Sequence, residues 1–302
     1  MARPLIGIVG PTATGKSELA VELAERLGGE VVNGDAMALY RGMEVGTARL
    51  PADRRRGIAH HQIDVLDVTE EASVAAYQRH ARDDIGGIRR RGHQPLLVGG
   101  SGLYIRAVTD QIDFPGQDPA VRAKWEDLGV RLGGPGLHAE LAERDPAAAG
   151  AINPGNVRRL VRALEVIELT GRPFTARLPD HTSWRPVRLV GLRLDLAELD
   201  RRIDRRARAM IEGGLLDEVA RLVAAGLRDG RTASRAIGYR QGLAVLDGLA
   251  TPAQAQAEIA LATRRLARRQ LKWFRRDPRI VWLDAAGPDL AGRTLAALDD
   301  DN

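Results

Sequence analysis

Short apolar runs alternate with amphipathic stretches through the first third of the chain. Apolar residues dominate at 5–9 and 94–98, a short strand pattern at 30–35 ends in an acid, and helical patterns cover 19–27 and 72–91. Strands buried on both faces of a parallel sheet read as continuous apolar runs, and crossover helices join them. The pattern therefore predicts an α/β fold with a parallel sheet at its core.

The pattern changes after residue 112. Helical periodicity extends over 119–170, with interruptions where glycine and proline cluster at 133–136 and 153–155. The helix predicted at 156–169 has one apolar stripe, formed by Val157, Leu160, Val161, Leu164 and Ile167. This segment is therefore expected to be helical.

A further strand pattern at 187–195 returns the chain to the sheet. We therefore expect residues 113–186 to form an inserted helical domain, and residues 1–112 and 187–302 to form the core together.

Two long amphipathic patterns, at 195–227 and 252–276, predict a helical C-terminal part rich in arginine. One face of the second carries Arg264, Arg268, Lys272 and Arg276. Like charges at this spacing repel by roughly 0.2–0.5 kcal/mol per pair, which a bound polyanion would offset. A solvated surface face is the alternative. Trp273 and Phe274 are expected either to stack on a base or to pack in the core.

A glycine-rich motif links the first predicted strand to the first predicted helix. It fits G-x-x-x-x-G-K-[ST] and consists of Gly10, Pro11, Thr12, Ala13, Thr14, Gly15, Lys16 and Ser17. In this context the motif is typical of a phosphate-binding loop, where backbone N–H groups and the helix N-terminus attract an anion. Lys16 is expected on the terminal phosphates and the Ser17 hydroxyl on Mg²⁺. The motif favours a P-loop NTPase-like core; a glycine-rich turn with a chance lysine is the alternative.

Asp35 follows the second predicted strand, and Ser101 follows the strand predicted at 94–98. Because ligands bind at the carboxyl ends of strands in open parallel sheets, we expect Gly10, Asp35 and Ser101 around one crevice. A carboxylate there could hold Mg²⁺ through water or accept a proton; a turn or N-cap aspartate is the alternative. The sequence has no clear second acidic strand and no Asn-Lys-x-Asp motif, which disfavours a motor ATPase or GTPase and leaves an ATP-binding small-molecule kinase open.

Composition excludes several classes of site. The chain has 302 residues and no cysteine, so disulfides, thiol catalysis and cysteine-ligated zinc are excluded. Its net charge of +5 rests on arginine, which suits phosphates and nucleic acids. No apolar run of about 18 residues and no signal-peptide pattern occurs, which predicts a cytoplasmic protein without a membrane span.

These blocks together resemble the tRNA dimethylallyltransferase family, also called tRNA isopentenyltransferases or IPP transferases. The match runs nearly end to end and in family order, through residues 10–17, 35–48, 60–64, 98–104, 156–165, 235–241 and 263–275. Ala38 departs from the family pattern, in which glutamine is common at this place. The chain also lacks the zinc-finger extension of eukaryotic relatives and is similar to the compact bacterial type.

The resemblance implies a prenyltransferase enzyme. The dimethylallyl group of dimethylallyl diphosphate would pass to the exocyclic amine of the adenosine 3′ of the anticodon, at position 37, in tRNAs reading codons that begin with U. Residues 10–17 would bind the donor diphosphate, with Mg²⁺ as cofactor, and Asp35 would accept the amine proton. Thr12, Lys16, Ser101 and Arg122 would complete the catalytic set.

The resemblance also implies that a monomer binds the tRNA anticodon stem-loop. The residues expected to contact the tRNA are Asp35, Ala36, Met37, Ala38, Arg158, Arg159, Leu160, Val161, Arg162, Arg235, Arg264 and Arg268. The arginines would contact phosphates, and the adenine would leave its stack to reach the site. The alternatives are an adenylate isopentenyltransferase acting on free nucleotides, a P-loop small-molecule kinase and a non-enzymatic RNA-binding protein.

Overall fold

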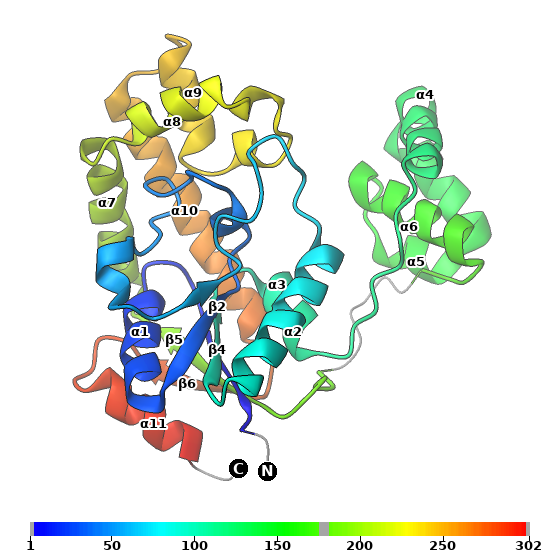
Figure 1. Cartoon of the computed structure of the whole chain (residues 1–302). Helices are drawn as coiled ribbons and strands as arrows, with labels where there is room; N and C mark the ends of the chain where they lie inside the picture. The colour runs from blue at the N-terminus through cyan, green and yellow to red at the C-terminus, as the bar shows by residue number, and fades with distance from the viewer. Residues whose placement is uncertain (1–2, 175–180, 300–302) are drawn as a thin grey trace. The chain divides into compact units, whose positions relative to one another are not determined.

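A parallel sheet forms the core of the unit built from residues 1–110 and 183–302 (Figure 1). The computed structural model describes residues 3–174 and 181–299. Within this part the sheet has six strands in the order β3-β2-β4-β1-β5-β6, and every pairing is parallel. The strands are β1 (Leu5–Val9), β2 (Gly29–Asn33), β3 (His60–His61), β4 (Gln94–Gly99), β5 (Val187–Arg193) and β6 (Ile280–Asp284). The predicted α/β fold is confirmed.

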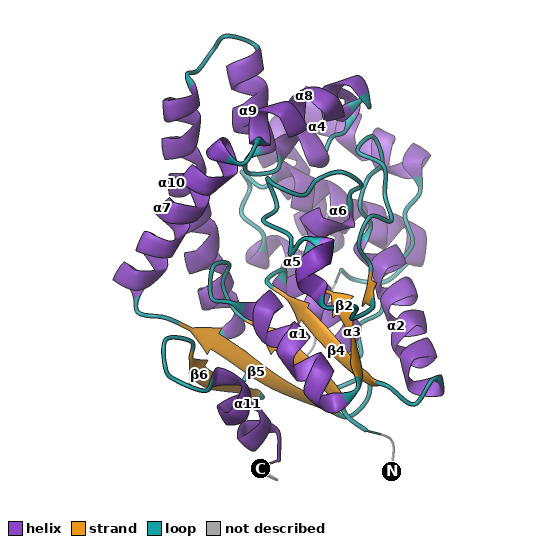
Figure 2. Ribbon diagram, turned by 60° about the vertical axis from the view of Figure 1, so that its left-hand side comes forward, coloured by secondary structure: helices purple, strands orange, loops and turns teal. Residues whose placement is uncertain are grey.

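Both faces of the sheet are buried, and alternate residues of one strand supply the two cores. In β1, Leu5 and Val9 pack with α2 (Val74–Arg90) and α3 (Gly102–Thr109). Ile6 and Ile8 pack with α1 (Lys16–Leu27) and α11 (Leu290–Asp299), which lie along the sheet in Figure 2. Successive side chains of a strand point to opposite faces, which explains the continuous apolar run. Because the strands are parallel, the loops after β1, β2 and β4 meet at one edge of the sheet.

The C-terminal helices build a third core, which includes Ala13, Tyr40 and Met43. These helices are α7 (Leu196–Glu212), α8 (Leu215–Ala224), α9 (Tyr239–Leu246) and α10 (Pro252–Phe274). The pattern at 195–227 is two helices rather than one, because the chain turns at Gly214, which has φ +90°. Short 3-10 helices are η1 (Ala36–Leu39), η2 (Ala52–Arg55), η3 (Leu227–Asp229) and η4 (Ala233–Arg235).

The chain divides into two compact units. Residues 1–110 and 183–302 form the core unit, and residues 111–182 form the inserted unit. The described part of the inserted unit contains α4 (Pro119–Arg144), α5 (Pro146–Ala151) and α6 (Val157–Thr170). Gly133 interrupts α4 with φ +68°, where the glycine cluster predicts a break. The inserted unit has its own apolar core, whose residues include Trp125, Leu137, Leu141, Leu160 and Leu164.

Candidate active site

The motif at residues 10–17 forms a loop between β1 and α1 whose shape depends on two glycines. Gly10 has φ +131°, and a Cβ there would lie 2.5 Å from the Leu192 carbonyl oxygen of the neighbouring strand. Gly15 has φ +89° and begins α1 without a side-chain cap. The first N–H groups of the helix therefore have no side-chain cap, and the positive end of the helix can attract an anion.

Two cations reach this loop from different helices. Lys16 is buried at the start of α1, and its Nζ donates a hydrogen bond to the Pro11 carbonyl oxygen at 2.7 Å. The Arg206 guanidinium, from α7, donates to Thr12 Oγ1 at 2.9 Å. Burial lowers the pKa of Lys16 to about 8, although the nearby Asp35 carboxylate acts in the opposite direction. Two positive groups, Lys16 and Arg206, thus meet at this loop and are partly withdrawn from water.

Asp35 lies directly after β2, and neighbouring polar groups orient its carboxylate. Ser101 Oγ donates a hydrogen bond to Asp35 Oδ1 at 3.0 Å and accepts one from Ala36 N at 3.1 Å. Asn33 holds the Asp35 backbone, because its Oδ1 accepts from Asp35 N at 3.0 Å and its Nδ2 donates to Asp35 O at 2.9 Å. Asp35 Oδ2 accepts no hydrogen bond from the described residues, so it is available to a ligand.

Gln270 of α10 connects the phosphate loop to the end of β4. Its Oε1 accepts a hydrogen bond from Thr12 N at 3.0 Å, and its Nε2 donates to the Gly100 carbonyl oxygen at 3.0 Å. The side chain is buried. Because Gly100 directly precedes Ser101, this one residue holds the phosphate loop in place against the Asp35–Ser101 pair.

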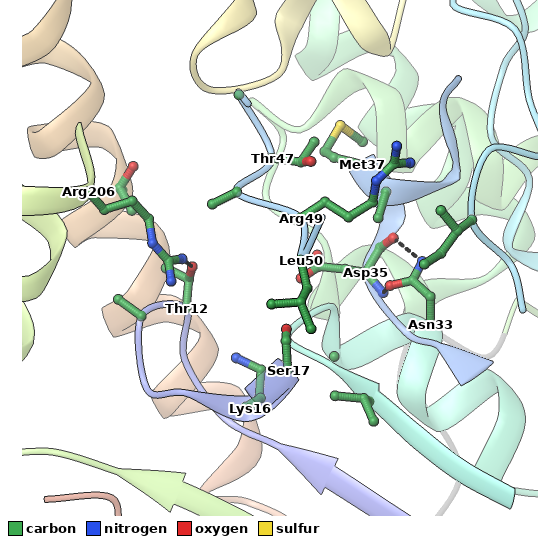
Figure 3. A pocket seen from close by; sticks show the side chains of 18 of the residues that line it. Thr12, Lys16, Ser17, Asn33, Asp35, Met37, Thr47, Arg49, Leu50 and Arg206 are labelled. Carbon is green, nitrogen blue, oxygen red and sulfur yellow. Dashed lines mark hydrogen bonds between the residues drawn. The ribbon is translucent and has the colours of Figure 1, made fainter. Parts of the chain in front are cut away.

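The loop, Asp35 and Arg206 line one cavity of about 540 Å³ (Figure 3). Its polar wall includes Thr12, Lys16, Ser17, Asn33, Asp35 and Arg206. Its apolar wall includes Met37, Ala38, Leu50, Ile63, Ile259 and Leu266. A cavity with an anion-binding wall and an apolar wall suits a small molecule that joins a phosphate to a hydrocarbon group.

Arg206 and Gln270 are not among the site residues predicted from the sequence. They lie 194 and 258 positions from Thr12, which both of them contact. The only local signal for Arg206 is its place beside the buried stripe of α7, formed by Leu199, Ile203 and Ala207. Such a stripe indicates which face of a helix is buried, but it does not identify the neighbour.

The predicted tRNA-contacting arginines of the core unit differ in their surroundings. Arg235 is exposed and lines the cavity. Arg264 pairs with Asp204 at 3.1 Å, and Arg268 pairs with Asp200 at 2.8 Å. Acids of α7 therefore offset part of the charge repulsion that the α10 sequence predicts, without a bound polyanion.

The residues that follow Asp35 and the two aromatic residues at the end of α10 differ in how far they are exposed. Ala36 and Met37 are half-buried, and Ala38, at the place of the usual glutamine, is buried in the cavity wall. Phe274 packs in the core, whereas Trp273 is 37% exposed. The two aromatic residues thus have different environments.

In the inserted unit the structure corrects two predicted contacts. Leu160 and Val161 are 0% and 1% exposed and pack in the core of this unit, so their side chains cannot touch tRNA as predicted. Both belong to the apolar stripe of α6, and burial of that stripe holds the unit together. Arg158 and Arg159, on the same helix, are exposed.

The other two predicted residues of the inserted unit form ion pairs within it. Arg122 binds Glu126 at 2.9 Å and lies 3.7 Å from Glu165. Arg162 binds Glu165 at 2.8 Å and donates hydrogen bonds to two backbone carbonyl oxygens of the loop before α4. The role of Arg122 beside the reacting base stays a prediction.

In residues 3–174 and 181–299, no group of three or more His, Cys, Asp or Glu side chains is arranged to hold a metal ion. In the same residues, no helix combines the length and apolar character needed to cross a membrane.

Comparison of the sequence with known proteins identifies close relatives. The family model for IPP transferase matches residues 38–277. A tRNA dimethylallyltransferase of Saccharopolyspora erythraea is 60% identical over 296 residues, which cover 98% of this chain and 96% of the relative. That of Streptomyces avermitilis is 57% identical and covers 97% of this chain and 94% of the relative.

Solved structures agree with the sequence relatives. The tRNA isopentenylpyrophosphate transferase of Bacillus halodurans is 39% identical with a TM-score of 0.70, and the match covers 98% of this chain and 97% of that chain. A eukaryotic dimethylallyltransferase, solved acting on tRNA, is 26% identical with a TM-score of 0.82 over 97% of this chain and 77% of that one. With a family model matching most of its length and relatives identical at more than half of their positions, the chain belongs to the IPP transferase family.

Proposed function

We propose that this chain transfers a dimethylallyl group from dimethylallyl diphosphate to the exocyclic amine of the adenosine 3′ of the anticodon, at position 37, in tRNAs that read codons beginning with U. Membership of the IPP transferase family supports this reaction. The observation that carries the proposal is the Asp35–Ser101 pair, 3.0 Å apart, beside the phosphate loop. The site thus offers a proton acceptor and an anion-binding loop next to each other.

In the proposed step, the exocyclic nitrogen of adenine attacks C1 of the donor. A nitrogen–carbon bond forms while the bond between C1 and the diphosphate oxygen breaks. The proton of the nitrogen passes to the Asp35 carboxylate, which Ser101 orients. Negative charge develops on the departing diphosphate, where Lys16, Arg206 and the N-terminal N–H groups of α1 stabilise it.

The loop residues fit Mg²⁺. The Ser17 side chain lines the cavity near Lys16, and its hydroxyl has no hydrogen-bond partner in the described part of the chain. Mg²⁺ in phosphate sites takes one or two protein ligands and completes its shell with phosphate oxygens and water, so a cluster of acids is not required. Ser17 would hold the ion, whose charge would help to neutralise the diphosphate.

A prenyl-transfer assay tests the proposal. Purified protein, Mg²⁺ and labelled dimethylallyl diphosphate are mixed with an anticodon stem-loop that carries adenosine 3′ of the anticodon. Free AMP and a stem-loop with guanosine at that position are the matched acceptors. Label on the adenosine stem-loop alone is the expected result. Label on AMP instead would favour the free-nucleotide enzyme, and phosphate transfer from ATP without prenyl transfer would favour a kinase.

Donor binding should weaken above pH 8. A diphosphate needs Lys16 in its charged form, and burial lowers the pKa of Lys16 to about 8. Below this pH the lysine is protonated and Kd for dimethylallyl diphosphate should be flat. Above it, Kd should rise toward about tenfold per pH unit, because binding must then take up a proton. Calorimetric titrations from pH 6.5 to 9.5 measure this. The same titrations on K16M should lack the inflection, and a wild-type Kd unchanged up to pH 9.5 would contradict the assignment.

A second face of α10 offers a basic surface for RNA phosphates. It carries Arg265, Arg269 and Lys272, and Arg276 follows in the turn just past the helix end. All four are exposed and form no ion pair within the described residues. Arg264 and Arg268, by contrast, are paired with acids of α7. Unpaired cations bind phosphates without first breaking an ion pair, so we place the main RNA contacts of α10 on this face.

This assignment predicts different effects for two faces of one helix. The R269A/K272A variant should lower the slope of log K against log salt concentration by about 1 for each lost phosphate contact. R268A, on the paired face, should change the slope by less than half as much. Stem-loop binding measured by fluorescence anisotropy between 50 and 300 mM salt (roughly the range in which phosphate contacts dominate) gives both slopes. If R268A changes the slope more than R269A/K272A does, the main RNA contacts of α10 lie on the face of Arg264 and Arg268 instead.

A further inference from the structure

One wall of the cavity has no regular secondary structure. Gly46, Thr47, Ala48, Arg49 and Leu50 all line the cavity, and the segment 44–50 belongs to no helix or strand. Figure 3 shows the side chains of Thr47, Arg49 and Leu50 around the hollow that Lys16 and Thr12 also border. The shape of this wall therefore depends on contacts that the segment makes with other elements.

The backbone hydrogen bonds inside the segment form local turns, and an ion pair joins Arg49 to Glu44. Ala48 N donates to the Val45 carbonyl oxygen at 3.0 Å, and Arg49 N donates to the Glu44 carbonyl oxygen at 3.1 Å. Ala48 has φ +51°, a conformation that side-chain-bearing residues adopt only when the surroundings impose it. A turn of this kind needs an external support to keep one shape.

An ion pair of 2.6 Å between Arg49 and Asp64 holds the C-terminal end of the segment, and Glu218 of α8 supports its N-terminal end. Its Oε2 accepts hydrogen bonds from Glu44 N at 3.1 Å and Val45 N at 2.8 Å. Its Oε1 accepts from Gly46 N at 3.1 Å and from the Tyr239 hydroxyl at 2.7 Å. The residue is 2% exposed and forms no ion pair in the described part of the chain. Four donors thus stabilise a buried carboxylate that no cation neutralises.

The ring of Tyr239 holds the same turn from the side. A Cβ at position 46 would lie 2.5 Å from this ring, so the Gly46 backbone is seated directly against it. Burial and the Glu218 carboxylate raise the pKa of Tyr239, which keeps its hydroxyl protonated as a donor. Glu218 and Tyr239 therefore form one anchor, reaching the wall from the C-terminal helices.

We infer that Glu218 is a positioning residue for the donor pocket: by holding residues 44–46 it sets the path of the turn that leads to Ala48 and Leu50, and so how closely the apolar wall fits the prenyl group. This inference rests on the proposed function. Glu218 does not line the cavity, and it acts through the wall that it holds. Leu50 and Ala48 supply apolar atoms to that wall, so a loosened turn would admit a longer hydrocarbon chain.

The chemistry of the anchor requires both carboxylate oxygens. In E218Q only one accepting oxygen remains. With its nitrogen on the Oε1 side, the amide can donate to the Tyr239 hydroxyl oxygen but faces Gly46 N–H, which is also a donor. At least one of the three backbone hydrogen bonds is therefore lost at nearly constant volume. Y239F removes one bond and leaves all three backbone bonds. D217N changes the exposed acid next to Glu218 on the same helix and leaves the anchor intact.

Steady-state kinetics with saturating stem-loop and two donors, dimethylallyl and geranyl diphosphate, test the inference. For E218Q we expect kcat/KM for dimethylallyl diphosphate to fall at least tenfold, mainly through KM. The preference for dimethylallyl over geranyl diphosphate should fall at least threefold. Y239F should shift both quantities in the same direction by two- to fivefold, and D217N should match the wild type. Circular dichroism at the assay temperature establishes that each variant is folded.

Each outcome bears on a different statement. Wild-type protein that transfers no prenyl group from either donor to the stem-loop would remove the proposed function itself. The role of Glu218 would be overturned by the following result: the wild type is active, and E218Q is folded but keeps both KM and donor preference within twofold of the wild type. A fall in kcat with unchanged KM and preference would also overturn it, because loss of folded enzyme alone gives that result. If E218Q does not fold, the KM and the donor preference of Y239F test the inference in its place.

Discussion

Replacing Asp35 by asparagine should lower kcat for prenyl transfer about a thousandfold, while the Kd of dimethylallyl diphosphate changes less than threefold. The amide keeps the size of the carboxylate and can still bond to Ser101, but it cannot accept the proton of the attacking amine. The phosphate loop is untouched, since Asp35 reaches the cavity from β2 and the loop from β1. Single-turnover assays with labelled donor measure kcat, and calorimetry measures donor binding.

The matched control for this change is D53N. Asp53 is an exposed aspartate of η2 and does not line the cavity. It should leave kcat and donor affinity at wild-type values. If D35N retains more than a tenth of wild-type kcat, Asp35 is not the proton acceptor. The hydrogen-bonded pair of Asp35 and Ser101 would then serve only to hold the adenine.

The second large effect is expected at Lys16. K16M should weaken donor binding about a hundredfold and lower kcat/KM about a thousandfold, because the charged lysine contacts the diphosphate both before and during its departure. Its Nζ is already turned toward the loop by the Pro11 carbonyl oxygen, 2.7 Å away. Calorimetry with dimethylallyl diphosphate and Mg²⁺ gives the binding effect, and initial rates at low donor concentration give kcat/KM.

K124M supplies the comparison, since Lys124 is an exposed lysine of the inserted unit paired with Glu168. It should bind the donor as the wild type does. A K16M protein with wild-type donor affinity would mean that the diphosphate lies elsewhere in the cavity, and the assignment of residues 10–17 as the donor loop would be wrong.

Periodicity of apolar residues was sufficient to predict four of the six strands, whereas the edge strands β3 and β6 were not predicted. The runs at 5–9 and 94–98 are β1 and β4, and the acid that ends the run at 30–35 lies just past β2. Each of these predictions depends on neighbours within a few residues along the chain. Burial on both faces requires an unbroken apolar run, and this requirement can be recognised without knowing which helix covers which face.

Predictions were weaker where the partner lies far along the chain. The spacing in the predicted helix at 252–276 grouped Arg264 and Arg268 with Lys272 and Arg276, yet the first two pair with Asp204 and Asp200 of α7. The sequence also placed Leu160 and Val161 on an apolar stripe, and the structure buries that stripe rather than presenting it to RNA. The angle at which two helices pack decides such contacts, and spacing within one helix does not define that angle.

The sequence by itself determined the parallel α/β sheet, the phosphate loop at residues 10–17 and the acid that follows β2, because all three depend on local spacing and backbone geometry. Only the tertiary structure decided that Arg206 and Gln270 complete the loop and that Glu218 holds the cavity wall. Those side chains come from helices about 170 to 260 positions away, and the packing of these helices beside the carboxyl edge of the sheet brings them there. Contacts of this kind depend on the whole fold, so no segment of the sequence encodes them alone.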